Sequence, residues 1–202
     1  MENSPEEYFE GLFNWVKENR GVDLMVEVIK DDWLLIIKLH ALVETALNTA
    51  LIKHLQAPEL AKIIGKLETS NPATGKVAFA KALNILAPDS AAFLQKLSEL
   101  RNFCVHDVRN FSFELDKYIA DIDPQKRSQL LNIVNKQLIP EARDNPKVAM
   151  RLKLMSGTMS IMMQMQVHDQ QCQIRDLRKQ LLERKAELYD EHERTQSTPN
   201  SE

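Results

Sequence analysis

The sequence predicts an all-α protein: an up-and-down helical bundle with an extra N-terminal helix and a long C-terminal helix. The chain of 202 residues contains 5 Gly and 8 Pro, too few for a sandwich or barrel that turns about every ten residues. Apolar residues recur at three- and four-residue spacing, and polar or proline-containing breaks separate these stretches. Hydrophobic residues make up 44% of the chain, enough for one folded domain with an appendage.

Residues 1–30 are predicted to form an acidic N-terminal helical extension. Ser4 is a candidate N-cap, Pro5 fits the first turn, and Glu7 stands three residues after the cap. The apolar stripe of this helix comprises Tyr8, Phe9, Leu12, Phe13 and Val16. We expect the helix to end near Gly21.

Residues 31–145 are predicted to form the bundle, with four or five antiparallel helices. The strongest periodic segment lies between Asp31 and Gln56 and predicts a core helix of about 24 residues. Its expected buried residues are Leu34, Ile37, Ala41, Leu42, Thr45, Leu47, Leu51 and Leu55. Shorter helical stretches follow at 60–67, 77–86, 90–106 and 124–139, and Asp89 or Ser90 is the expected cap of the third.

Residues 146–194 are predicted to form a methionine-rich C-terminal helix, followed by a disordered polar tail at 195–202. Six of the eight methionines lie between positions 150 and 165. Beyond them a heptad pattern places Val167, Ile174, Leu181 and Leu188 at position a. Position d holds Leu177 but also Gln170 and Arg184, so the heptads are imperfect. Two interpretations remain open: a helix that mediates dimerisation, and a helix packed on its own domain.

Charge and cysteine content restrict the class of protein. A formal net charge of −3 lacks the broad basic field of a dedicated duplex-binding domain. Two cysteines, Cys104 and Cys172, favour a reducing compartment over a disulfide-stapled secreted scaffold. The longest aliphatic run, Leu34 to Ile37, is far below the ~20 residues of a membrane span. We therefore expect a cytoplasmic protein without a membrane partner.

The segment from Leu100 to Asp107 is the most informative for function. It carries Arg101, Asn102 and His106 at the end of an apolar helix. On an ideal helix Arg101 and His106 lie about 140° apart, whereas Asn102 and His106 share one stripe. One chain alone does not bring Arg101 and His106 together, but two copies related by a two-fold axis could form a cleft with duplicate imidazoles and guanidiniums.

Such a cleft suits phosphate chemistry. A guanidinium stabilises a phosphoryl group, and an imidazole can transfer a proton near neutral pH. The plausible reaction is metal-independent attack of a ribose 2′-hydroxyl on its own phosphodiester, with RNA as the substrate. In the alternative, Arg101 pairs with a carboxylate such as Glu99 or Asp107, and Asn102 and His106 satisfy the helix C-terminus.

Three stretches together resemble the HEPN superfamily, in particular its branch of mannitol-operon-repressor-like proteins: Gly75–Leu86, Leu97–Asp107 and Phe111–Phe113. The signature of that superfamily is an Arg, four to six residues and a His, often with Asn after the Arg. The resemblance implies a dimeric bundle with the signature near the end of a late helix. It also implies either a ribonuclease with catalytic residues Arg101, Asn102 and His106, or a non-catalytic regulator that binds another protein.

Glu44 stands in a polar stripe with His40 and Asn48 on the long predicted core helix. Such a stripe is typical of a solvent-facing surface. Because this helix should pack beside the signature helix, Glu44 could instead hold Arg101 or orient His106.

Three other patterns favour structural interpretations, and we expect no cofactor or metal. Thr74-Gly75-Lys76 lacks the remaining residues of a phosphate loop and predicts a helix start. His168 and Cys172 have helical metal-ligand spacing, but no second pair stands near them in sequence, which favours a surface pair over a zinc site. The methionine cluster favours packing at a helix contact.

Overall fold

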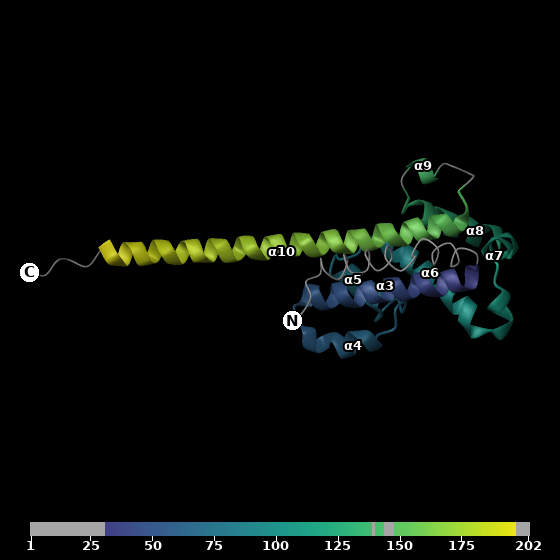
Figure 1. The fold of residues 1–202 in the computed structure, drawn as a ribbon, viewed down its shortest axis with the longest axis horizontal. Coiled ribbons are helices and arrows are strands. Elements are labelled where there is room, and N and C mark those ends of the chain that lie inside the picture. The colour runs from purple at the N-terminus through teal and green to yellow at the C-terminus, as the bar shows by residue number, and fades with distance from the viewer. Residues whose placement is uncertain (1–30, 139, 144–147, 197–202) are drawn as a thin grey trace, which may run out of the picture.

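The computed structural model describes residues 31–138, 140–143 and 148–196, and the described chain is all-α with no strand. The predicted N-terminal helix within 1–30 lies outside these residues. The elements are α3 (Asp32–Leu55), η1 (Pro58–Leu60), α4 (Ala61–Lys66), α5 (Lys76–Ala82), α6 (Pro88–His106), η2 (Val108–Ser112), α7 (Leu115–Asp121), α8 (Pro124–Asn135), α9 (Pro140–Arg143) and α10 (Met150–Gln196). Figure 1 shows a bundle from which α10 extends well beyond the other helices.

Helix α3 is the central helix of the bundle and packs mainly against α10 and α6. It has the predicted length of 24 residues, begins after the N-cap Asp31 and ends at Gln56, which adopts a left-handed conformation with φ 51°. The prediction of its buried face was partly wrong. Leu47 and Leu51 are buried as expected, but the other buried apolar residues are Leu35, Ile36, Leu39 and Val43.

The buried face of α3 includes two polar residues, and for this reason it differs from the face expected from apolar residues alone. Asp32 and His40 are buried on it, whereas Ala41, Leu42 and Thr45 are exposed. Almost every turn of this helix carries apolar residues on several sides, so periodicity alone does not select one face. The partners of the two polar residues, which lie far away in sequence, decide the face.

The Asp32 carboxylate joins three helices near the start of α3. Its Oδ1 lies 2.6 Å from Arg151 Nε on α10, and its Oδ2 accepts a 2.8 Å hydrogen bond from Leu115 N at the start of α7. Next to it, Trp33 Nε1 donates to Cys104 O on α6 at 3.0 Å. The first turn of α3 therefore fixes the positions of α6, α7 and α10.

Helix α6 begins at Pro88, before both expected caps, Asp89 and Ser90. Its N-cap is Ala87, with Pro88 in the first turn and no side-chain capping bond. Ser90 is buried within the helix, and its hydroxyl lies 2.7 Å from Gln164 Oε1 and 3.2 Å from Gln137 Oε1. The prediction of Asp89 or Ser90 as cap was wrong, because proline at the first helical position fixes the start and leaves Ser90 to bond helices packed against α6.

Helix α10 divides into two halves, and the first half packs on its own domain, as one of the two interpretations of the sequence predicts. Its first half packs on the bundle through Met150, Leu154, Ile161, Met162 and Met165, all buried. Its second half leaves the bundle (Figure 1) and exposes Ile174, Leu177, Leu181, Leu182 and Leu188. The predicted boundary at 145/146 therefore separates the buried residues of α10 from the bundle in which they are buried. At its other end the helix continues through Thr195 and Gln196, which were predicted to belong to the tail.

By length and apolar composition, α3 is also the one described helix that could cross a membrane. The longest aliphatic run in the sequence, Leu34 to Ile37, is too short to predict such a helix. In the structure the apolar face of α3 lies in the core of the bundle.

Gly157 on α10 leaves room for the Phe93 side chain of α6. A Cβ atom at Gly157 would lie 2.7 Å from Phe93 Cε2 and 2.9 Å from Phe93 Cζ, and Phe93 is itself buried. We expect Gly157→Ala to lower the free energy of unfolding by about 1–3 kcal/mol, since the overpacking outweighs the better helix propensity of alanine. Urea unfolding followed by circular dichroism measures this change.

The matched control is Gly65→Ala in α4, where an added Cβ meets no atom within 4 Å. This variant should keep or slightly raise the stability. Equal effects of the two substitutions would contradict the packing of the Phe93 ring against Gly157.

Candidate functional site

The three signature residues lie in the last turns of α6, which ends at His106. Arg101 is half-buried, and its Nη1 donates to Asn102 Oδ1 at 3.1 Å. His106 is exposed. Among the described residues no hydrogen bond or ion pair joins Arg101 to His106, in keeping with the wide angle between them on a helix. The two side chains do not form a joint site within one chain.

The carboxylates considered as partners of Arg101 are engaged elsewhere. Glu99 pairs with Lys96 at 2.6 Å, and Asp107 pairs with Arg109 at 2.6 Å. Within the described part of the chain, Arg101 therefore has no carboxylate partner. Its guanidinium keeps donors that can reach an anion.

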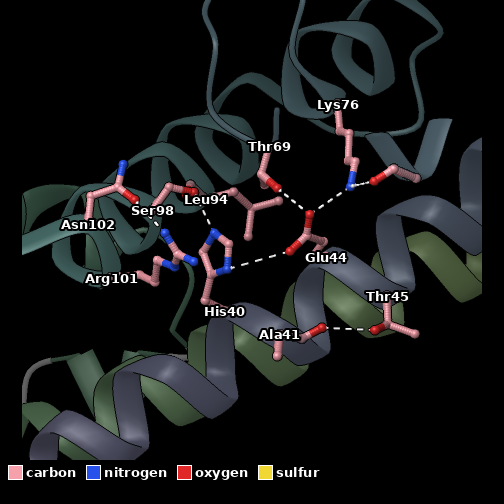
Figure 2. A network of polar contacts seen from close by, with 11 residues as sticks. His40, Ala41, Glu44, Thr45, Thr69, Lys76, Leu94, Ser98, Arg101 and Asn102 are labelled. Atoms are coloured by element: carbon pink, nitrogen blue, oxygen red, sulfur yellow. Dashed lines mark hydrogen bonds and ion pairs between the residues drawn. The ribbon is translucent and has the colours of Figure 1, made fainter. Parts of the chain in front are cut away.

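Glu44 is held by α5 and the loop before it. Glu44 Oε1 accepts from Lys76 Nζ at 2.6 Å and from Thr69 Oγ1 at 3.0 Å. Its other oxygen, Oε2, lies 3.9 Å from His40 Nδ1. Figure 2 shows this network, with Arg101 on the far side of the His40 ring. Glu44 makes no described hydrogen bond with Arg101 or His106, so any influence on Arg101 passes through His40.

Lys76 is the buried cation of the network. It is the first residue of α5, its side chain is 0% exposed, and its Nζ also donates to Gly65 O at 3.3 Å. The helix start expected at Thr74-Gly75-Lys76 is confirmed, and burial of the Lys76 side chain follows from it. Gly75 is required here because an added Cβ would lie 2.5 Å from Asn71 O.

His40 connects the network to α6. Ser98 Oγ donates to Leu94 O at 3.0 Å and lies 3.2 Å from His40 Nε2. A serine hydroxyl has one proton, so while Ser98 donates to Leu94 O it can only accept from His40, and the imidazole proton then lies on Nε2. Burial lowers the pKa of His40; Glu44 raises it, whereas Arg101 and Lys76 lower it further. The ring is therefore neutral at pH 7 and separates two cations from each other.

The charge of Glu44 is retained despite partial burial. Burial alone would raise the pKa of Glu44, but hydrogen bonds from Lys76 and Thr69 hold it below its ordinary value. The network thus runs from a positive Arg101 through a neutral His40 and a negative Glu44 to a positive Lys76. This arrangement fixes a polar contact between α3, α5 and α6 inside an apolar bundle.

The sequence indicates His40 only as part of the polar stripe with Glu44, and it does not indicate Ser98 or Thr69. Their positions carry no periodic signal, because a serine or histidine on a helix is equally compatible with a solvent-facing surface. A polar residue at a core position of α3 could have indicated this network. To recognise such a residue, the buried face of α3 must first be predicted correctly.

Apolar side chains are exposed where α6 ends. We call Phe103, Val105, Val108 and Phe111 the α6-end patch; all four are exposed. A pocket of about 480 Å³ lies beside the patch, and its walls include Phe103, Phe113 and Tyr118. Arg109 adds little free positive charge there, because its Nε lies 3.0 Å from Asp107 Oδ1 and 2.9 Å from Oδ2.

Comparison with known proteins finds no matching family model, no similar curated protein and no similar solved structure. The resemblance to the HEPN superfamily therefore depends on the quoted sequence stretches alone.

The buried Lys76 makes its pair with Glu44 asymmetric. Glu44→Gln should lower the free energy of unfolding by about 3 kcal/mol, because it leaves a buried ammonium group without a counter-charge. Lys76→Met should cost about 1 kcal/mol or less, since the Glu44 side chain is 37% exposed and can be hydrated. Urea unfolding of both variants tests this order, and a larger loss for Lys76→Met would contradict it.

Proposed function

We propose that the protein is a self-associating, non-catalytic interaction module of the cytoplasm, in which α10 pairs with α10 of a second copy. The observation that carries this proposal is the exposed heptad seam of α10. We call Val167, Ile174, Leu181 and Leu188 the α10 seam; their exposed fractions are 50, 51, 71 and 51%. No described part of the chain covers these side chains.

An isolated helix with such a surface is stabilised by pairing, because its exposed apolar side chains become buried. Buried apolar area contributes roughly 25 cal/mol per Å², and position a of a coiled coil is the most deeply buried. Leu177, at position d, extends the seam and is also exposed. The seam is short and imperfect, which suits a reversible association better than a permanent one.

The flanking charges favour a second copy in parallel orientation. Positions e beside the seam hold Gln171, Arg178 and Lys185, and positions g hold Gln173, Gln180 and Glu187. In a parallel pair, e faces g of the partner helix, so Arg178 meets glutamine. In an antiparallel pair, e faces e, and Arg178 would meet Lys185 with like charge.

The resemblance to mannitol-operon-repressor-like regulators agrees with such a module. In this proposal the seam supplies the dimer, and the α6-end patch is available to a regulatory protein partner. The local pairing of Arg109 with Asp107 reduces the positive field around the signature, which favours a protein partner over a nucleic acid.

Leu181→Lys tests the seam. It should shift the protein from dimer toward monomer, because a charge at position a opposes burial. The matched control is Leu182→Lys: Leu182 is 66% exposed beside a Leu181 that is 71% exposed, but it lies off the seam. Light scattering after size exclusion measures the mass, and a monomeric wild type or equal masses of the two variants would contradict the proposal.

A second candidate function, a metal-independent endoribonuclease, is favoured by one specific observation: Arg101 has no carboxylate partner among the described residues while His106 on the same helix end is exposed. A dimer formed through the α6-end patch would place both signatures at one interface. His106 would then act as general base or acid, Arg101 would bind the phosphate, and Asn102 would position either of them.

The ribonuclease hypothesis predicts RNA cleavage in the presence of a chelator. His106→Ala should lower the rate by about 100-fold or more, whereas its helical content should stay unchanged because His106 is exposed in the single chain. A gel assay with labelled single-stranded RNA measures the rate. Equal cleavage by both proteins, or none by either, would exclude the enzyme.

A further inference from the structure

Two segments far apart in the sequence bring three metal-ligating side chains together outside the signature. His54 lies in the last turn of α3, whereas His168 and Cys172 lie one turn apart on α10. The ligand atoms lie within 4.8 Å of one another, and all three residues are half-buried. Sequence spacing favoured a surface pair because the third residue stands more than 100 positions away.

The distances between the three atoms match the edges of a metal-centred tetrahedron. His54 Nδ1 is 3.2 Å from His168 Nε2, and Cys172 Sγ is 3.5 Å from His168 Nε2 and 3.9 Å from His54 Nδ1. With Zn–N near 2.0 Å and Zn–S near 2.3 Å, tetrahedral angles give about 3.3 Å between nitrogens and about 3.5 Å between nitrogen and sulfur. One ion fits between the three atoms with small adjustments of the side chains.

We propose that His54, His168 and Cys172 bind a divalent transition metal ion, with zinc as the expected ion and solvent at the fourth position. Imidazole and thiolate are the ligands that zinc prefers, and zinc accepts irregular geometry because its filled d shell imposes none. A shallow pocket of about 330 Å³ adjoins the ligands and gives an ion and its water access from solvent.

Charged groups of both signs surround the three ligands. Lys53 pairs with Asp169 at 3.2 Å, so its charge is compensated. Arg175 Nη2 donates to Cys172 Sγ at 3.4 Å. The carboxylate of Asp176 also lines the pocket and accepts from Gln56 Nε2 at 2.8 Å.

The bound ion would clamp α10 to the end of α3 at the point where α10 leaves the bundle. On a helical wheel, His168 and Cys172 lie about 150° from the α10 seam. The metal therefore holds one face of α10 and leaves the opposite face open. Binding does not depend on self-association and can be measured on a monomeric variant such as Leu181→Lys.

The test uses the untagged full chain and metal salts alone. We expect one zinc ion per chain by titration calorimetry and elemental analysis, and a higher melting temperature in zinc than in chelator. With cobalt(II), the wild type should show the thiolate charge-transfer band and the intense visible bands of a tetrahedral site. Failure to bind either ion in stoichiometric amount would overturn the proposal.

Variants assign the ligands. Cys172→Ser should abolish the thiolate band, and His54→Gln should weaken zinc binding by roughly 100-fold or more. The matched control is Cys104→Ala, since Cys104 is buried and its pKa is raised to about 11, so its thiol should not contribute to the band. Melting in chelator shows whether each variant folds. Folded Cys172→Ser or His54→Gln protein that binds zinc as the wild type does would overturn the assignment, and the wild-type cobalt spectrum decides if a variant fails to fold.

Discussion

The buried carboxylate of Asp32 is the contact on which the arrangement of the bundle depends. It accepts from the first backbone amide of α7 and forms an ion pair with Arg151 near the start of α10. A buried carboxylate is costly unless it is paired and hydrogen-bonded, so these partners must come together when α3 packs. The first turn of α10 is thereby fixed, and the direction of a 47-residue helix follows from it.

Polar contacts at three places along α3 join it to different helices of the bundle. At the start of α3, Asp32 fixes α7 and α10; in the middle, His40 and Glu44 join α5 and α6; in the last turn, His54 meets His168 and Cys172 of α10. Each contact is directional, whereas the apolar core of Leu47, Leu51 and their neighbours is not. The core supplies stability, and the polar contacts select which helices meet and in which register.

The sequence predicted the helical class, the length of α3, the end of α6 at the signature and the helix start at Gly75-Lys76, because local periodicity and breakers determine them. It failed at the buried face of α3 and at the cap of α6. The start of α6 is set by Pro88 at its first position, whereas the buried face of α3 depends on distant partners, such as Arg151 for Asp32. The same reason hid the ligand cluster: His54 lies 114 residues from His168, and one sequence carries no signal of that contact.

The central claim is that α10 is anchored on one face and pairs with a second copy through the other. Cysteine cross-linking tests it most directly. In a parallel, in-register pair the two copies of residue 181 face each other, so Leu181→Cys should form an intermolecular disulfide in high yield under mild oxidation. The adjacent Leu182→Cys should cross-link no more than the wild type. Equal cross-linking at both positions, or none at 181, would contradict the account.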